Sequence, residues 1–174
     1  MKTLVIHPKD STTDFLSVIY ADKDWTIIDD AKVSNNFLKE QIKSHDRIIM
    51  LGHGTEQGLI AWEGRYDYRH IISSDLVYLL REKKCVCIWC NADVFAKKYE
   101  LKGFYTGMII SEVDEANLFC VPCKFEDIEQ SNVLFAESVR KSIDSNEMLI
   151  EMKKDYSSDS NSIIIFNARN LYTA

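Results

Sequence analysis

The sequence has no long apolar run, few residues that break regular structure and no excess of positive charge. No apolar stretch approaches the roughly 18 residues of a membrane-spanning helix, and the apolar run 4–6 is too short for the core of a signal peptide. The chain has only six glycines and two prolines, and 21 Lys and Arg stand against 27 Asp and Glu, which gives a formal charge of −6. This balance offers no electrostatic basis for binding nucleic acid or an anionic membrane. We therefore expect a soluble, cytoplasmic protein that binds neither.

The residues that are present fit a single globular domain over residues 1–174. Hydrophobic residues make up 46% of the chain and charged residues 28%, as in ordinary folded proteins. A domain of this size buries about 70% of the surface of its unfolded chain, so its core needs no metal or disulfide. The five cysteines are an odd number. In a reducing compartment we expect them to be free thiols, metal ligands or a nucleophile.

Short apolar runs alternate with segments of helical periodicity. The sequence predicts strands at residues 3–6, 25–28, 47–51, 59–62, 85–90, 107–111 and 163–166, and helices at residues 34–44, 75–83, 91–99, 131–142 and 146–154. This alternation predicts an α/β fold, a three-layer sandwich with a mainly parallel central sheet of about six strands. In such sheets, ligands bind at the carboxyl ends of the strands.

Two loops at that edge carry residues suited to nucleophilic catalysis. His53 lies between two glycines after the strand 47–51, and Cys90 ends the strand 85–90. A right-handed crossover places these strands side by side or nearly so, which lets an imidazole and a thiol meet at one edge. The imidazole can take the thiol proton, and the helix that follows Cys90 lowers the thiol pKa. The backbone N–H groups of Gly54 and Cys90 are candidates for an oxyanion hole.

These segments resemble the signature of the caspase-like cysteine peptidases, a group that includes bacterial relatives of the caspases. In that group one hydrophobic strand ends in His-Gly and a second ends in Cys. The matching residues are Ile48-Ile49-Met50-Leu51-Gly52-His53-Gly54 and Val86-Cys87-Ile88-Trp89-Cys90. The glycine-punctuated stretch 52–62 is similar to the hairpin after the catalytic histidine of caspases, and the resemblance covers about residues 45–120. It implies His53 as base, Cys90 as nucleophile, Gly54 at the oxyanion hole, a protein or peptide substrate and no cofactor or metal.

Four residues near the two motifs are expected to contact the substrate. Trp89 stands where many family members have a small or acidic residue, and it could alter or block the pocket for the substrate side chain. Asp93 follows at the start of the next helix. Asp114 and Glu115 lie in the segment where the family builds part of its cleft, and their carboxylates could select a basic side chain. The alternative function is a caspase-like domain without catalytic activity that binds a partner protein.

The cysteines allow two further patterns. Cys87 and Cys90, with Cys120 and Cys123, form two C-x-x-C pairs, which is the ligand number of a structural zinc site. Residues three apart on a strand point to opposite faces, so Cys87 and Cys90 can bind one metal only if the strand ends early. The pair at 120 and 123 also resembles a thioredoxin-type redox pair, but it does not follow a first central strand as in that family.

Overall fold

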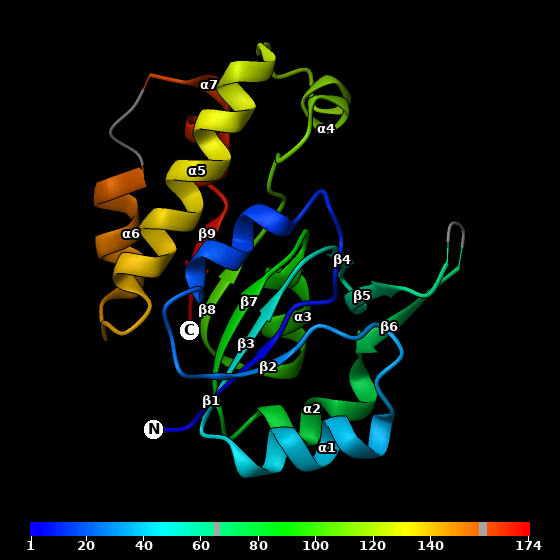
Figure 1. Ribbon diagram of the computed structural model, residues 1–174. Helices are drawn as coiled ribbons and strands as arrows, with labels where there is room; N and C mark the ends of the chain where they lie inside the picture. Colours follow the sequence, from blue (N-terminus) through cyan, green and yellow to red (C-terminus); the bar gives the residue numbers. More distant parts are fainter. Residues whose placement is uncertain (65–66, 157–159) are drawn as a thin grey trace.

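A six-stranded sheet forms the centre of the molecule in a computed structural model that describes residues 1–64, 67–156 and 160–174 (Figure 1). Its strand order is β2-β1-β3-β7-β8-β9. All neighbours are parallel except β8 and β9, which run antiparallel. The strands are β1 (Thr3–Ile6), β2 (Thr26–Ile28), β3 (Arg47–Leu51), β7 (Lys84–Ile88), β8 (Lys102–Thr106) and β9 (Leu171–Thr173). A smaller antiparallel sheet contains β4 (Gly54–Thr55), β5 (Gly58–Trp62) and β6 (Tyr68–Ile72).

Helices cover both faces of the central sheet, which confirms the three-layer α/β fold. On one face lie α1 (Asn35–Ser44), η2 (Ser74–Leu76), α2 (Val77–Leu80) and α3 (Ala92–Tyr99). On the other lie η1 (Asp14–Ile19), α5 (Phe125–Ser142), α6 (Met148–Tyr156) and part of α7 (Ser162–Ala168). Side chains of β7 alternate between the layers: Cys85 and Cys87 join the first core, and Val86 and Ile88 join the second. Each central strand is therefore buried on both faces, as its continuous apolar run predicts.

A helical extension rises beyond the carboxyl edge of the sheet. It contains α4 (Val113–Leu118), the first part of α5 and α7, which share a small apolar core built on Ile110, Ala116, Ile128 and Ile163 (Figure 1). The carboxyl ends of the central strands lie below this extension. The space between the two is where a ligand of an open α/β sheet is expected.

The strand predicted at 107–111 is wrong, because the strand lies earlier, at Lys102–Thr106. The sequence does not indicate this strand, because it contains Gly103 and glycine is unusual inside a strand. The apolar residues after this strand have backbone N–H and carbonyl groups that need hydrogen-bond partners. For Ile110, the side chain of Asn167 is the partner of both groups. Its Oδ1 accepts from the Ile110 N–H at 2.8 Å, and its Nδ2 donates to the Ile110 carbonyl at 2.9 Å. The amide side chain of Asn167 thus makes the two hydrogen bonds that the backbone of a neighbouring strand would make.

The strand predicted at 163–166 is also wrong, because this segment is helix α7. The Asn161 side chain accepts hydrogen bonds from the N–H groups of Ile163 and Ile164, which caps the helix. Ile163, Ile164 and Asn167 are buried, whereas Ile165 is 40% exposed. That spacing is helical, but a run of three isoleucines favours a strand by propensity alone. The edge strand beside β8 is instead β9.

The other elements agree with the sequence except at their ends. The strands predicted at 3–6, 25–28, 47–51, 59–62 and 85–90 and the helices at 34–44 and 91–99 are confirmed within a few residues. Ser34 caps α1 by accepting a hydrogen bond from the Phe37 N–H at 3.3 Å. The predicted helix 75–83 is shorter, since only η2 and α2 form. The helix predicted at 131–142 begins earlier, at Phe125, and the one predicted at 146–154 is α6. No helix in the described part of the chain has the length and apolar character needed to cross a membrane.

Gly103 gives a test of the β7–β8 pairing on which this arrangement depends. Its φ of +129° disfavours other residues, and a Cβ there would lie 2.0 Å from the Cys85 carbonyl oxygen. We expect Gly103→Ala to lower the free energy of unfolding by about 2–4 kcal/mol in urea titrations. Gly64→Ala is the control, because the nearest atom to its Cβ would be Asp67 Cβ at 4.0 Å. Equal stability of the two variants would contradict this account of β8.

Candidate functional site

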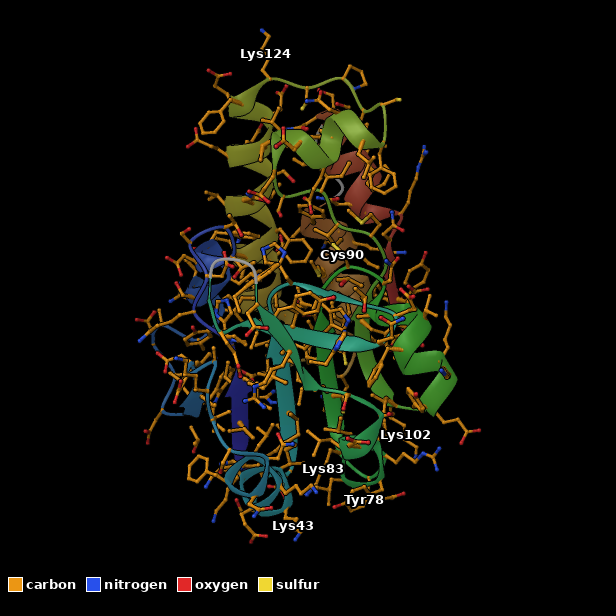
Figure 2. All side chains as sticks on the ribbon, turned by 90° about the vertical axis from the view of Figure 1, so that its right-hand side faces the viewer. Lys43, Tyr78, Lys83, Cys90, Lys102 and Lys124 are labelled. Atoms are coloured by element: carbon orange, nitrogen blue, oxygen red, sulfur yellow. The ribbon has the colours of Figure 1, made fainter. Side chains whose placement is uncertain are left out.

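His53 and Cys90 lie at the carboxyl ends of two neighbouring strands. β3 and β7 are paired in parallel from Arg47 and Lys84 to Leu51 and Ile88. His53 follows β3 by two residues, and Cys90 follows β7 by two. Both line one small cavity of about 30 Å³ beneath the helical extension, where Figure 2 shows Cys90. These two residues therefore lie at the same edge of the sheet, as the sequence predicts from a right-handed crossover.

Cys90 is a largely enclosed thiol. Its Sγ donates to the Ile109 carbonyl at 3.5 Å, and among the described residues no hydrogen bond joins it to the imidazole of His53. Burial raises the pKa of Cys90 to about 11, and the nearby carboxylate of Glu115 adds to the effect. At neutral pH the side chain is therefore a thiol, and a nucleophilic role requires a base.

His53 is held by a chain of hydrogen bonds from the loop after β1. Its Nε2 lies 2.6 Å from Thr12 Oγ1, which donates in turn to Asp10 Oδ1 at 2.7 Å. Because the Thr12 hydroxyl gives its proton to Asp10, it accepts from Nε2. The ring proton is thereby assigned to Nε2, and the lone pair of the neutral ring is on Nδ1. Asp10 lies 3.9 Å from Nε2, close enough to stabilise an imidazolium.

Within the part of the chain that the structure describes, two backbone N–H groups near the cavity can bind an anion. The Ile60 N–H donates to the His53 carbonyl at 2.8 Å, so residues 53 and 60 form a hydrogen-bonded pair of the hairpin. The next pair, Gly54 and Leu59, is then non-hydrogen-bonded, and the Gly54 N–H points away from β5. The Cys90 N–H has no acceptor within the described part of the chain. Both groups proposed for the oxyanion hole therefore keep their donor capacity.

Trp89 is buried beneath the small sheet. Its Nε1 donates to the Thr55 carbonyl at 3.0 Å, and its ring makes an edge contact with Phe95. A Cβ at Gly54 would lie 2.1 Å from the indole, so only glycine fits above it. Trp89 lines the cavity as part of its wall. Its main contacts are with β4 and α3.

The acidic residues expected to contact a substrate differ in their placement. Glu115 lines the cavity, but its carboxylate already accepts from the N–H groups of Ser111 at 2.7 Å and Glu112 at 3.2 Å. Asp93 forms an ion pair with Lys97 along α3. Asp114 lies exposed in the first turn of α4. Among the residues that line the cavity in the described chain, neither Asp93 nor Asp114 occurs.

The loop after β1 is the part of the site that the sequence analysis missed. It supplies Asp10 and Thr12 to the hydrogen-bond chain on His53, and Thr13 to the cavity wall. His7 fixes this loop, because its ring nitrogens bond Tyr20 Oη at 2.9 Å and Thr13 Oγ1 at 3.3 Å. Burial lowers the pKa of His7. A usable signal was present: a polar run follows a predicted buried strand, at the same edge as the two loops considered.

The two C-x-x-C pairs lie in different parts of the molecule. Cys87 is buried in the core with α3, whereas Cys90 faces the cavity. Cys120 and Cys123 belong to the extension. In the described ranges no group of three or more His, Cys, Asp or Glu side chains could hold a metal ion. The geometry that a four-cysteine zinc site requires is thus not formed by these residues.

Comparison with known proteins adds no family to these observations. No protein-family model and no curated protein matches the chain. The case for a function therefore depends on the residues around Cys90 and on their resemblance to the caspase-like signature.

Proposed function

We propose that the chain is a caspase-like cysteine peptidase that cleaves peptide bonds through a thioester on Cys90. The observation that supports this most is the hydrogen-bond chain from Asp10 through Thr12 to His53, a residue that lines the same cavity as Cys90. A loop histidine with a purely structural role has no need of a carboxylate-backed partner on one nitrogen and a free lone pair on the other. A base that acts on a thiol needs both.

The first half of the proposed reaction forms the thioester. Nδ1 of His53 accepts the Sγ proton of Cys90, and the thiolate attacks the scissile carbonyl carbon. The negative oxygen that forms is bound by the N–H groups of Gly54 and Cys90. When the carbon–nitrogen bond breaks, the leaving amine takes the proton from Nδ1.

The second half releases the acid product. Water gives a proton to Nδ1 and attacks the thioester carbon, and the thiolate leaves and recovers the proton. Thr12 and Asp10 keep the other ring proton on Nε2 and stabilise the imidazolium in both halves. These two are positioning residues, because they act through His53.

Substrate entry requires a change at Ile109. The cavity of about 30 Å³ accommodates about one water molecule rather than a peptide, and the thiol is bound to the Ile109 carbonyl. In the proposed reaction the Cys90 side chain rotates from that carbonyl toward Nδ1 as the peptide displaces the segment 109–111.

The same enclosure favours the alternative of a non-catalytic domain that binds a partner protein. A thiol with a pKa of about 11 and no bond to a base is the expected state of an inert cysteine. The two functions differ in one measurable property. Only the peptidase activates Cys90 when a peptide is bound.

Peptide acyloxymethyl ketones test the proposed dyad, because they alkylate a cysteine after their peptide part has bound. At pH 7 we expect a library of these reagents to modify Cys90 and no other thiol, as mapped by mass spectrometry. His53→Ala should slow the modification by at least about 100-fold, since it removes the base. Cys90→Ala should abolish both modification and cleavage of a peptide library.

The pH dependence separates the two functions. Since burial raises the thiol pKa to about 11, the reaction of resting Cys90 with iodoacetamide should rise about tenfold per pH unit from 7 to 10. For the peptidase, the rate with a peptide reagent levels off near neutral pH instead. A tenfold rise per unit with both reagents, or no modification of Cys90, would support the non-catalytic domain.

Thr12 should set the tautomer of His53. Thr12→Val removes the hydroxyl that accepts from Nε2, and we expect at least about a tenfold loss of peptide-reagent reactivity, the effect of one hydrogen bond. Thr12→Ser keeps the hydroxyl and should restore the rate. Nitrogen chemical shifts of the His53 ring should report Nε2–H in the native and Thr12→Ser proteins and a mixture in Thr12→Val. The role of Thr12 is refuted if Val and Ser variants share one rate and one tautomer.

A further inference from the structure

A second, larger cavity lies at the opposite edge of the central sheet. It has a volume of about 560 Å³ and lies between the first residues of β7 and β8, the end of β9, and the segment from Ser145 to Ile150 that begins α6. Figure 2 shows Lys83 and Lys102, which line it, in the lower half of the view, below Cys90. The proposed peptidase reaction makes no use of this cavity.

A row of three cations crosses the sheet beside this cavity. Arg47, Lys84 and Lys102 are register partners on β3, β7 and β8. Partners in a parallel sheet lie on the same face, about 4.8 Å apart between strands. Residues two apart on a strand point to the same face of the sheet. Lys84 therefore shares the face of Val86, and Lys102 that of Phe104, which is the face covered by α5 and α6. Three positive side chains in such a row repel one another unless anions lie between them.

Of these cations, Arg47 alone has a carboxylate partner among the described residues. Arg47 is buried and donates to Asp144 Oδ1 at 2.9 Å and to the Ile143 carbonyl at 3.0 Å. Lys84 and Lys102 have no ion-pair partner among the residues that the structure describes. Two glutamates, Glu82 and Glu147, also line the cavity but do not pair with these lysines within the described chain.

The third lysine of the cavity is already engaged. Lys83 Nζ donates to the carbonyl oxygens of His45 at 2.6 Å and Lys43 at 3.2 Å. The polar capacity that remains comes from Lys84, Lys102 and the start of α6. There the N–H groups of Met148 and Leu149 have no acceptor in the described ranges. These donors all favour an anion.

Apolar side chains form another part of the lining. Val86, Phe104, Met148 and Leu149 face the cavity from the sheet and from α6. A ligand that fits must therefore combine one anionic group with an apolar body. The ion pair between Arg47 and Asp144 shows that this row of cations already binds one carboxylate, which comes from the segment before α6.

We propose that this cavity binds a small amphipathic carboxylate, with its head group between Lys84 and Lys102 and its apolar body on Phe104 and Leu149. The carboxylate of the ligand neutralises Lys84 and Lys102, as Asp144 neutralises Arg47. The apolar body removes the exposed part of the cavity wall from water. This site is separate from Cys90, so it holds whether or not the chain is a peptidase.

Calorimetric titration of the full chain with decanoate tests the proposal. We expect saturable binding with a Kd below about 1 mM, as a ligand of about a dozen heavy atoms can provide. Decanol lacks the charge and acetate lacks the apolar body, so each should bind at least about tenfold more weakly. The double variant Lys84→Gln, Lys102→Gln should also lose at least about tenfold in affinity. Lys98→Gln, Lys141→Gln is the matched control and should bind like the native chain.

Amide chemical shifts locate the ligand independently of any variant. Decanoate should shift the signals of Lys84, Lys102 and Leu149 and leave those of His53 and Cys90 unchanged. The proposal is overturned by any of three results: no saturable binding, equal binding of decanoate and decanol, or shifts centred away from this cavity.

Discussion

The parallel pairing of β3 with β7 is the constraint on which the candidate site depends. Residues Arg47 to Leu51 lie in register with Lys84 to Ile88, so both strands end at one level of the same edge. β1 pairs with the other side of β3 and ends there as well. A slip of one residue would turn every side chain of a strand to the other layer, and each strand here is buried on both faces. The burial of the two cores thus fixes where the strands end, and with this the positions of His53, Cys90 and the Asp10–Thr12 loop at the edge of the sheet.

Burial and reactivity oppose each other at the same edge. The helical extension that covers the carboxyl ends of the strands excludes water from Cys90 and gives its proton an acceptor in Ile109. This enclosure stabilises the thiol against the thiolate, whereas Asp10 and Thr12 prepare the imidazole to receive a proton. The charge of Glu115 adds to the stabilisation of the thiol, while its carboxylate also accepts hydrogen bonds from the backbone at the start of α4. The site is therefore organised on the histidine side and closed on the cysteine side.

The sequence predicted the parts of this structure that depend on local pattern. Buried strands such as 47–51 are short apolar runs, and Ser34 is a helix cap that can be read directly. The errors arose where a distant side chain decides the outcome. Ile110 is not in a strand because Asn167, 57 residues away, satisfies its backbone, and Asn161 turns an isoleucine run into a helix.

The candidate site divides in the same way. His53 and Cys90 could be placed together from strand topology alone, whereas the partner of His53 could not. That partner lies 41 residues away on a loop whose path is fixed by the buried ring of His7. The enclosure of Cys90 by Ile109 likewise depends on where β8 ends, and the sequence misplaced that strand.

Gly54 and Trp89 form a single packing unit, and this affects how the His-Gly dipeptide should be interpreted. The indole lies so close to the α-carbon of residue 54 that any side chain there would have to displace it or the Gly58 carbonyl. Steric exclusion by a tryptophan 35 positions later is thus enough to account for glycine at this position, without any demand from chemistry. In this chain, the glycine after His53 is therefore not by itself a sign of catalysis.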